Sequence, residues 1–173
     1  MTLTLASALV LTGCTAPPPQ TVAVSSPTVA PVFASDEEAL AAAVEAYEKY
    51  LAVSTAIAHD GGNGIERLSR VSVGSALHTD EATFASFREQ RLTGTGEAAI
   101  STSRLKTFDR TGGVEMYVCT DVSRTDVVSA DGASTVDVTR SGIIPFELRL
   151  EWVEETKELL VSNSEVWVGT SFC

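Results

Sequence analysis

SDEEALAAAVEAYEKYLAVSTAIAH, residues 35–59, is the stretch that decides the fold. Ser35, followed three residues later by Glu38, is the capping-box pattern that begins a helix. Apolar residues then recur at three- and four-residue spacing, and Gly61-Gly62 closes the pattern. The stretch therefore predicts a long amphipathic helix over residues 36–59, with one face turned toward a core.

Two shorter helices are predicted after this one. A short helical stretch covers residues 65–71, and Thr79 with Asp80 is predicted to cap a third helix. Gly94 and Gly96 are expected to stop that helix. Its inner face is expected to carry Phe84, Phe87 and Leu92.

The hydropathy pattern changes to alternation, the period of a strand, from about residue 98 onward. Asp131-Gly132 is a hairpin signal between residues 126–129 and 134–138. Further strand segments are predicted over residues 98–108, 114–121, 146–152, 159–161 and 166–168. Helices followed by mostly antiparallel strands predict an α+β fold, with N-terminal helices packed on one face of a curved sheet.

The segment that precedes the long helix has a different composition. Residues 15–34 contain five of the six prolines of the chain and no charged residue. Such a composition favours extended, solvated chain, and twenty residues at about 3.1 Å each would reach roughly 60 Å. The segment is therefore predicted to be a tether, so that the folded domain covers residues 35–173.

An apolar run at the N-terminus ends in Leu11-Thr12-Gly13-Cys14. The run is too short to span a hydrocarbon core of about 30 Å and is typical of a secretion signal. Its end resembles the bacterial lipobox, in which an apolar residue and two small residues precede the lipidated cysteine. The resemblance implies that residues 1–13 are a leader. It also implies that Cys14 carries a diacylglycerol, which anchors the chain on the extracytoplasmic face of the cell membrane.

The leader departs from the usual pattern because residues 1–13 contain no Lys or Arg. Two explanations stay open, translation beginning upstream of Met1 or a truncated sequence. A different interpretation makes the N-terminus a buried helix with an incidental cysteine.

Three cysteines are present, and lipidation of Cys14 leaves Cys119 and Cys173. In an exported protein two remaining cysteines usually pair, so a disulfide is predicted. Closing a loop of about 55 residues would stabilise the fold by roughly 4 kcal/mol on the chain-entropy model. The alternatives are weaker, because these cysteines form no metal-binding motif and the C-terminal thiol lacks a neighbouring base in the sequence.

The chain is acidic, with 23 Asp and Glu against 12 Lys and Arg, a formal net charge of −11. Such a surface repels phosphate backbones, so no nucleic-acid partner is expected. Solubility explains the charge most simply, and a face that attracts cations or a basic partner is the alternative.

Several motifs in residues 36–173 carry a resemblance to known proteins. They are Ala46-Tyr47, Tyr50-Leu51, the run 118–123, Asp126-Val127-Val128, Ala130-Asp131-Gly132, Ser164-Glu165-Val166-Trp167 and Phe172-Cys173. With the order of elements, they resemble a group of uncharacterised actinobacterial secreted lipoproteins with an NTF2-like (cystatin-like α+β, cone-shaped) domain. The resemblance implies a cone-shaped fold but no particular activity, because that superfamily includes enzymes, ligand binders and assembly domains.

Candidate catalytic chemistry is sparse. His59-Asp60 at the end of the first helix is an acid/histidine pair of the type that NTF2-like enzymes place in the cone, but a histidine there also suits the helix dipole. His78 precedes the Thr79 cap and is interpreted as a loop residue. The sequence shows no metal-ligand spacing, phosphate loop or nucleophile elbow. No catalytic residue, metal site or cofactor is therefore assigned.

Tyr47, Tyr117 and Trp167 are the candidate pocket or interface residues, because amphipathic aromatic side chains favour sites with a polar partner, and packing in the core is the alternative for each. The favoured function is a membrane-anchored binding or protein-interaction module of the cell envelope, for a small apolar ligand or an envelope protein. The alternatives are an isomerase, dehydratase or hydrolase using an acid/His pair in the cone, and a purely structural envelope protein.

Overall fold

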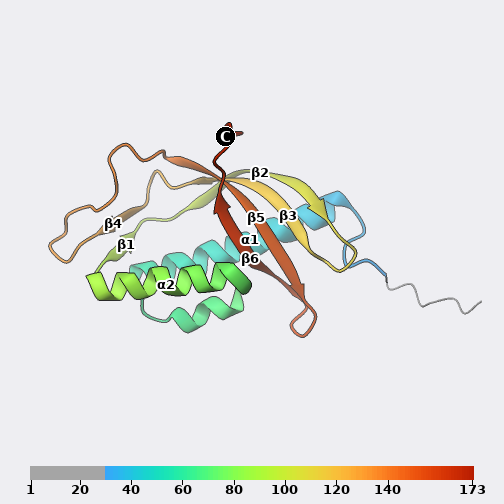
Figure 1. Cartoon of the computed structure of the whole chain (residues 1–173), viewed down its shortest axis with the longest axis horizontal. Coiled ribbons are helices and arrows are strands. Elements are labelled where there is room, and N and C mark those ends of the chain that lie inside the picture. The colour runs from blue at the N-terminus through green and yellow to red at the C-terminus, as the bar shows by residue number, and fades with distance from the viewer. Residues whose placement is uncertain (1–29) are drawn as a thin grey trace, which may run out of the picture.

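The computed structural model describes residues 30–173 (Figure 1). The proposed lipidation site Cys14 and most of the predicted tether lie outside the described residues. The elements are α1 (Asp36–His59), η1 (Ile65–Arg70), α2 (Gly74–Gln90), β1 (Thr93–Thr95), β2 (Ala99–Phe108), β3 (Val114–Asp121), β4 (Asp126–Val128), β5 (Ile143–Val153) and β6 (Glu158–Val166).

Helix α1 begins and ends where its local signals predicted. The backbone N–H of Glu38 donates to the Ser35 hydroxyl at 3.2 Å, and the Glu38 carboxylate accepts from the N–H of Ala34 at 2.7 Å. At the other end Gly62 has a φ of +85°, and a Cβ there would lie 2.3 Å from the carbonyl oxygen of Phe84. Only glycine allows this turn, which brings the chain back against α2.

The strands form two antiparallel sheets, with the order β2-β3-β5-β6 in the larger and β1-β4 in the smaller. Helix α1 lies along one face of the four-stranded sheet, which we call the inner face, while α2 packs against β6 (Figure 1). The opposite face of the four-stranded sheet is called the outer face. The α+β fold class, with N-terminal helices on a curved antiparallel sheet, is therefore confirmed.

The inner face and α1 enclose the main core. Alternate residues of β3 and β5 point toward α1 and are almost completely buried, and the small alanines of α1 let the helix lie close to the sheet. These residues are Val114, Met116, Val118, Leu148 and Leu150 on the sheet, and Ala39, Ala43 and Ala46 on the helix.

The last residues of the predicted tether pack on the domain. Phe33 is only 5% exposed, and its ring lies edge-on to Phe108 and Trp152 at centroid distances of 6.4 and 6.1 Å. The backbone N–H of Val32 donates to the carbonyl of Arg110 at 3.3 Å. The packed domain thus begins a few residues before the helix cap.

Helix α2 begins earlier than predicted. Thr79 and Asp80 lie within the helix rather than at its start, and His78 is an exposed helical residue 3.7 Å from the Glu81 carboxylate, not a loop residue. The helix starts at Gly74 without a side-chain cap, because contacts with β6 fix it there: the N–H of Val73 donates to the carbonyl of Val161 at 2.9 Å.

Two further predictions about loops are corrected. Gly94 does not stop a helix but lies in β1, where a Cβ would come within 2.6 Å of Ala58. The turn at Gly132 forms, but only one bridge, Val128 to Ser134, joins its two sides. The ladder of β4 is formed with β1, because the short hairpin alone buries too little to hold two full strands together.

Within residues 30–173, no helix is long and apolar enough to cross a bilayer.

Candidate functional site

The three candidate pocket residues are divided between the two faces of the sheet. Tyr47 lies on α1 against the inner face and is 2% exposed. Tyr117 and Trp167 come together on the outer face, with ring centroids 5.4 Å apart and an interplanar angle of 77°. The structure therefore does not bring all three residues to one site.

A polar chain crosses the interior from the sheet to α2. The hydroxyls of Tyr47 and Thr120 lie 3.1 Å apart, and the ring of Tyr47 stacks on Tyr50 at 5.6 Å. The Tyr50 hydroxyl in turn donates to Asp80 Oδ1 at 3.0 Å. Burial raises the pKa of Tyr47 to about 12 and raises that of Tyr50 further, so both phenols stay protonated.

Asp80 adds a carboxyl group to this interior, which the sequence did not predict to be buried. Burial raises the pKa of its carboxyl to about 6, although the hydrogen bond from Tyr50 lowers it. Its second oxygen, Oδ2, is buried without a hydrogen-bond partner among the described residues. Once α2 is known to start at Gly74, Asp80 falls on the stripe formed by Ala76 and Phe84, and that spacing was the signal that could have found it.

An aromatic cluster occupies the outer face, where the chain ends. The rings of Tyr117 and Phe172 lie 5.2 Å apart, and those of Trp167 and Phe172 lie 6.1 Å apart. The predicted disulfide between Cys119 and Cys173 is present, with a Cα–Cα distance of 5.8 Å. Because Cys119 lies two residues beyond Tyr117 on the same face, the disulfide holds residues 167–173 across the sheet.

A network of charges lies beside this cluster on three neighbouring strands. Lys106 of β2 contacts Glu115 of β3 at 2.9 Å and Glu147 of β5 at 2.5 Å, and Arg149 of β5 contacts Glu115 at 2.5 Å. The hydrogen bonds from Arg149 and Lys106 lower the pKa of Glu115. Lys106 and Arg104 also lie over the ring of Tyr117, at 5.9 and 5.3 Å from its centroid.

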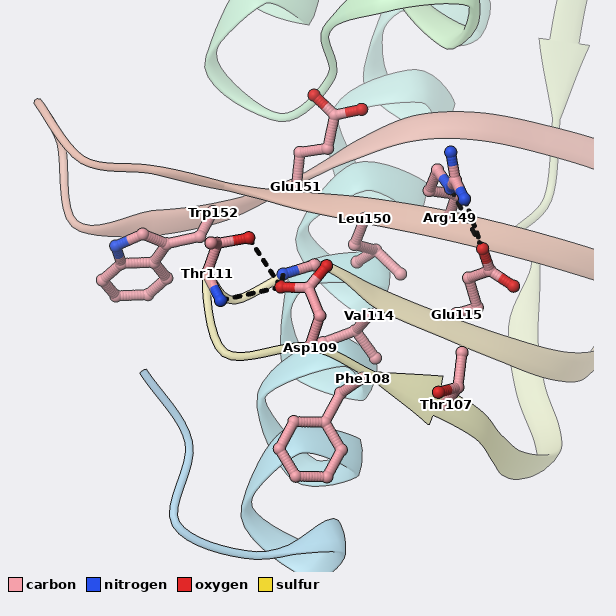
Figure 2. Close-up of a pocket in the computed structure, with 11 residues that line it drawn as sticks. Thr107, Phe108, Asp109, Thr111, Val114, Glu115, Arg149, Leu150, Glu151 and Trp152 are labelled. Carbon is pink, nitrogen blue, oxygen red and sulfur yellow. Dashed lines mark hydrogen bonds and ion pairs between the residues drawn. The ribbon is translucent and has the colours of Figure 1, made fainter. Parts of the chain in front are cut away.

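A cleft of about 430 Å³ opens at the β2–β3 hairpin, and Figure 2 shows its lining. Asp109 Oδ1 accepts from the backbone N–H and the hydroxyl of Thr111, at 2.8 and 2.6 Å, and from the N–H of Gly113 at 3.1 Å. These hydrogen bonds, chiefly that from the Thr111 hydroxyl, lower the pKa of Asp109. The carboxylate of Asp109 therefore stabilises the turn that joins β2 to β3.

The sequence pair His59-Asp60 does not form an acid/base site. The ring Nε2 of His59 lies 2.8 Å from the carbonyl oxygen of Gly96, so that nitrogen carries the donated hydrogen. Asp60 instead accepts from Arg67 at 3.1 Å. Both residues are exposed at the end of α1, outside the interior of the domain.

No group of three or more His, Cys, Asp or Glu side chains with a geometry suited to a metal ion occurs among residues 30–173.

The fold and the surface define an α+β domain whose sheet has one packed face and one open, disulfide-held face. Among solved structures, the intermembrane-space region of the chloroplast protein ARC6 is similar, with a TM-score of 0.53 and 13% identity over 75% of this chain and 97% of that chain. At this identity the likeness shows the fold alone. A de novo designed β-sheet protein matches with a TM-score of only 0.34 at 16% identity, over 73% of this chain and 90% of that chain. No protein-family model and no curated protein matches the chain.

Proposed function

We propose that this chain is a lipid-anchored, extracytoplasmic binding module that presents the outer face of its sheet to another protein of the cell envelope. A diacylglycerol on Cys14 would hold it at the membrane, and the proline-rich segment would carry the domain away from the bilayer. Membership of the actinobacterial lipoprotein group with an NTF2-like domain is part of the same proposal.

The observation that carries the proposal is the aromatic cluster held by a disulfide on the open face. Aromatic residues and arginine are enriched at protein interfaces, and rigid aromatic rings provide contact area at a small entropic cost. Tyr117, Trp167 and Phe172 are all half-buried rather than buried. Trp167 is flanked by Val166, which pairs with Phe146 on the inner-face side, and by Val168, which is 97% exposed next to the cluster.

The anchor is tested by mass spectrometry of protein extracted from membranes of the native host. We expect a mature chain beginning at Cys14 with a diacylglycerol on its sulfur, and we expect a Cys14→Ser variant to leave the membrane fraction. An unmodified Cys14 in the membrane-extracted protein would overturn the anchor.

The docking surface is tested with a photo-crosslinking residue at position 168, in the host cell envelope. Position 138 is the matched control, because Val138 is 99% exposed but lies on the loop after β4, away from the cluster. We expect a discrete crosslinked partner from position 168 and none from 138. Equal capture from both positions would refute the outer face as the docking surface, and capture of a second copy alone would favour the structural alternative.

A further inference from the structure

A second surface, between α1 and the free edge of the four-stranded sheet, has the features of a ligand site. A groove of about 460 Å³ runs between α1 and the start of β2. Its apolar lining includes Leu51, Ala52 and Ala56 of α1 and Ile100 of β2. Two carboxylates, Glu48 and Glu97, also line it.

The two carboxylates lie toward opposite ends of the groove. Glu97 follows Gly96, whose carbonyl contacts His59 at the C-terminal end of α1, whereas Glu48 lies eleven residues earlier on that helix. At about 1.5 Å rise per residue, this separation along the helix is roughly 16 Å, the length of about five residues of extended chain. Both side chains are exposed, and neither has an ion pair or hydrogen bond with a described residue.

One wall of the groove is the edge of the sheet. Strand β2 is hydrogen-bonded to β3 on one side only, and no other described strand pairs with its second edge. An edge strand presents unpaired backbone N–H and C=O groups, which an extended peptide can match in register. The register shift between Ile100 and Thr102 marks a bulge in the β2–β3 pairing, and the groove is lined by the residues before it, 97–100, of which Ala99 and Ile100 belong to β2.

We infer that this groove binds a short extended peptide segment of another protein, with apolar residues at its centre and Lys or Arg on both sides. The apolar side chains of the peptide would lie on Ala52 and Ala56 of α1, and its backbone would pair with residues 97–100. Its basic side chains would meet Glu48 and Glu97. This inference is independent of the docking surface on the outer face.

Two other occupants complement the groove less well. The chain's own segment 15–34 has no charged residue to pair with the carboxylates, and its described end packs beside Phe108 at the far end of β2. A second copy paired antiparallel through β2 would bring Arg104 and Lys106 near their own counterparts, and each copy carries a net charge of −11.

The probe for the test is a nonapeptide of alternating valine and threonine with two lysines at each end, titrated into the full chain in low-salt buffer. A peptide with glutamates in place of the lysines is its counterpart. We expect measurable binding of the lysine peptide only, weakened as salt is raised, with amide shifts confined to residues 48–59 and 97–100.

Two variants locate the site, each with a matched control on the same fold. The double variant Glu48→Lys, Glu97→Lys should weaken binding at least tenfold, whereas Glu66→Lys, Glu155→Lys, with the same change in net charge at exposed sites, should leave it within twofold. Ala52→Trp, which fills the groove from an exposed helix position, should abolish binding, whereas Ala41→Trp on the same helix should not.

The inference is wrong if the glutamate peptide binds equally well, if Ala52→Trp binds like Ala41→Trp, or if the chain dimerises through β2 instead. Equal binding by a peptide N-methylated at alternate amides would overturn the strand pairing. If the lysine peptide does not bind but a partner is captured from position 168, the groove proposal fails and the proposed function stands. If the peptide binds but no partner is captured from position 168, the groove proposal stands and the outer-face docking surface fails.

Discussion

The two faces of the four-stranded sheet are built from neighbouring residues of the same strands but are held together by different forces. On the inner face, apolar side chains such as Met116 and Leu148 are completely buried beneath α1. On the outer face the residues next to them, Tyr117 and Glu147, join an aromatic cluster and an ion-pair network that remain open to solvent.

This difference shows how a strand can serve stability and recognition at the same time. Burial fixes the inner face by removing apolar area from water, and that force needs no particular partner geometry. The outer face lacks a covering helix among the described residues, so a covalent bond orders the chain that crosses it. Such a surface can be rigid without being buried, which favours binding because little entropy is lost on docking.

The largest effect is expected from a cavity on the inner face. Leu148→Ala removes a completely buried side chain and should lower the free energy of unfolding by about 2–5 kcal/mol. The preceding residue on the outer face is the control, since Glu147→Ala should cost less than about 1 kcal/mol. Urea unfolding measures both, and equal costs would break the distinction between the faces.

A smaller loss is expected from removing the disulfide. Replacing both Cys119 and Cys173 with alanine should lower the free energy of unfolding by about 2–4 kcal/mol, because the loop of 54 residues is no longer closed in the unfolded chain. Trp167 fluorescence should shift to longer wavelength as the cluster opens, in a Trp152→Phe background that leaves it as the remaining tryptophan. An unchanged spectrum would show that the aromatic contacts order residues 167–173 without the bond.

The polar chain of the interior should make stability depend on pH. The pKa of Asp80 is raised by burial to about 6 from a usual value of 3.8, so the folded state binds this proton more tightly than the unfolded state. The contribution of Asp80 to the free energy of unfolding therefore increases as pH falls from about 7 to about 4. Asp80→Asn should remove that increase and be at least as stable as the parent at pH 7.5, as measured by urea unfolding across this range. A variant less stable at pH 7.5 would mean that the charged carboxylate is favoured in the fold.

The sequence predicted those elements whose signals are local. Helix α1 has its own cap and closing glycines, and β3 and β5 have clear alternation, so their places were confirmed. The start of α2 was wrong because β6 holds it through Val73 and Val161, which are far apart in sequence. The pairing of β4 with β1 was missed for the same reason, and the predicted pairing across Gly132 is reduced to the bridge between Val128 and Ser134.

The features of the candidate site also divide into those that the sequence predicted and those that depend on tertiary contacts. The pairing of Cys119 with Cys173 followed from counting cysteines, and the contact of Tyr117 with Trp167 puts two predicted aromatic residues together. The contribution of Phe172 depends on where the last seven residues cross the sheet, which periodicity does not specify. Asp80 was missed because its burial depends on the start of α2, itself set by tertiary contacts.

The smallest effect is expected from the ion pairs of the outer face. Glu115→Gln removes the carboxylate shared by Lys106 and Arg149; the Glu115 side chain is 22% exposed, and those of its two partners are 38% and 60% exposed. Since water and salt screen charges at such sites, the free energy of unfolding should fall by less than about 1 kcal/mol, and by still less in high salt. A loss greater than that of the disulfide would mean that charge pairing, rather than the covalent bond, holds the open face. The expected small loss would leave these charges free to exchange partners, as a docking surface requires when another protein replaces water over them.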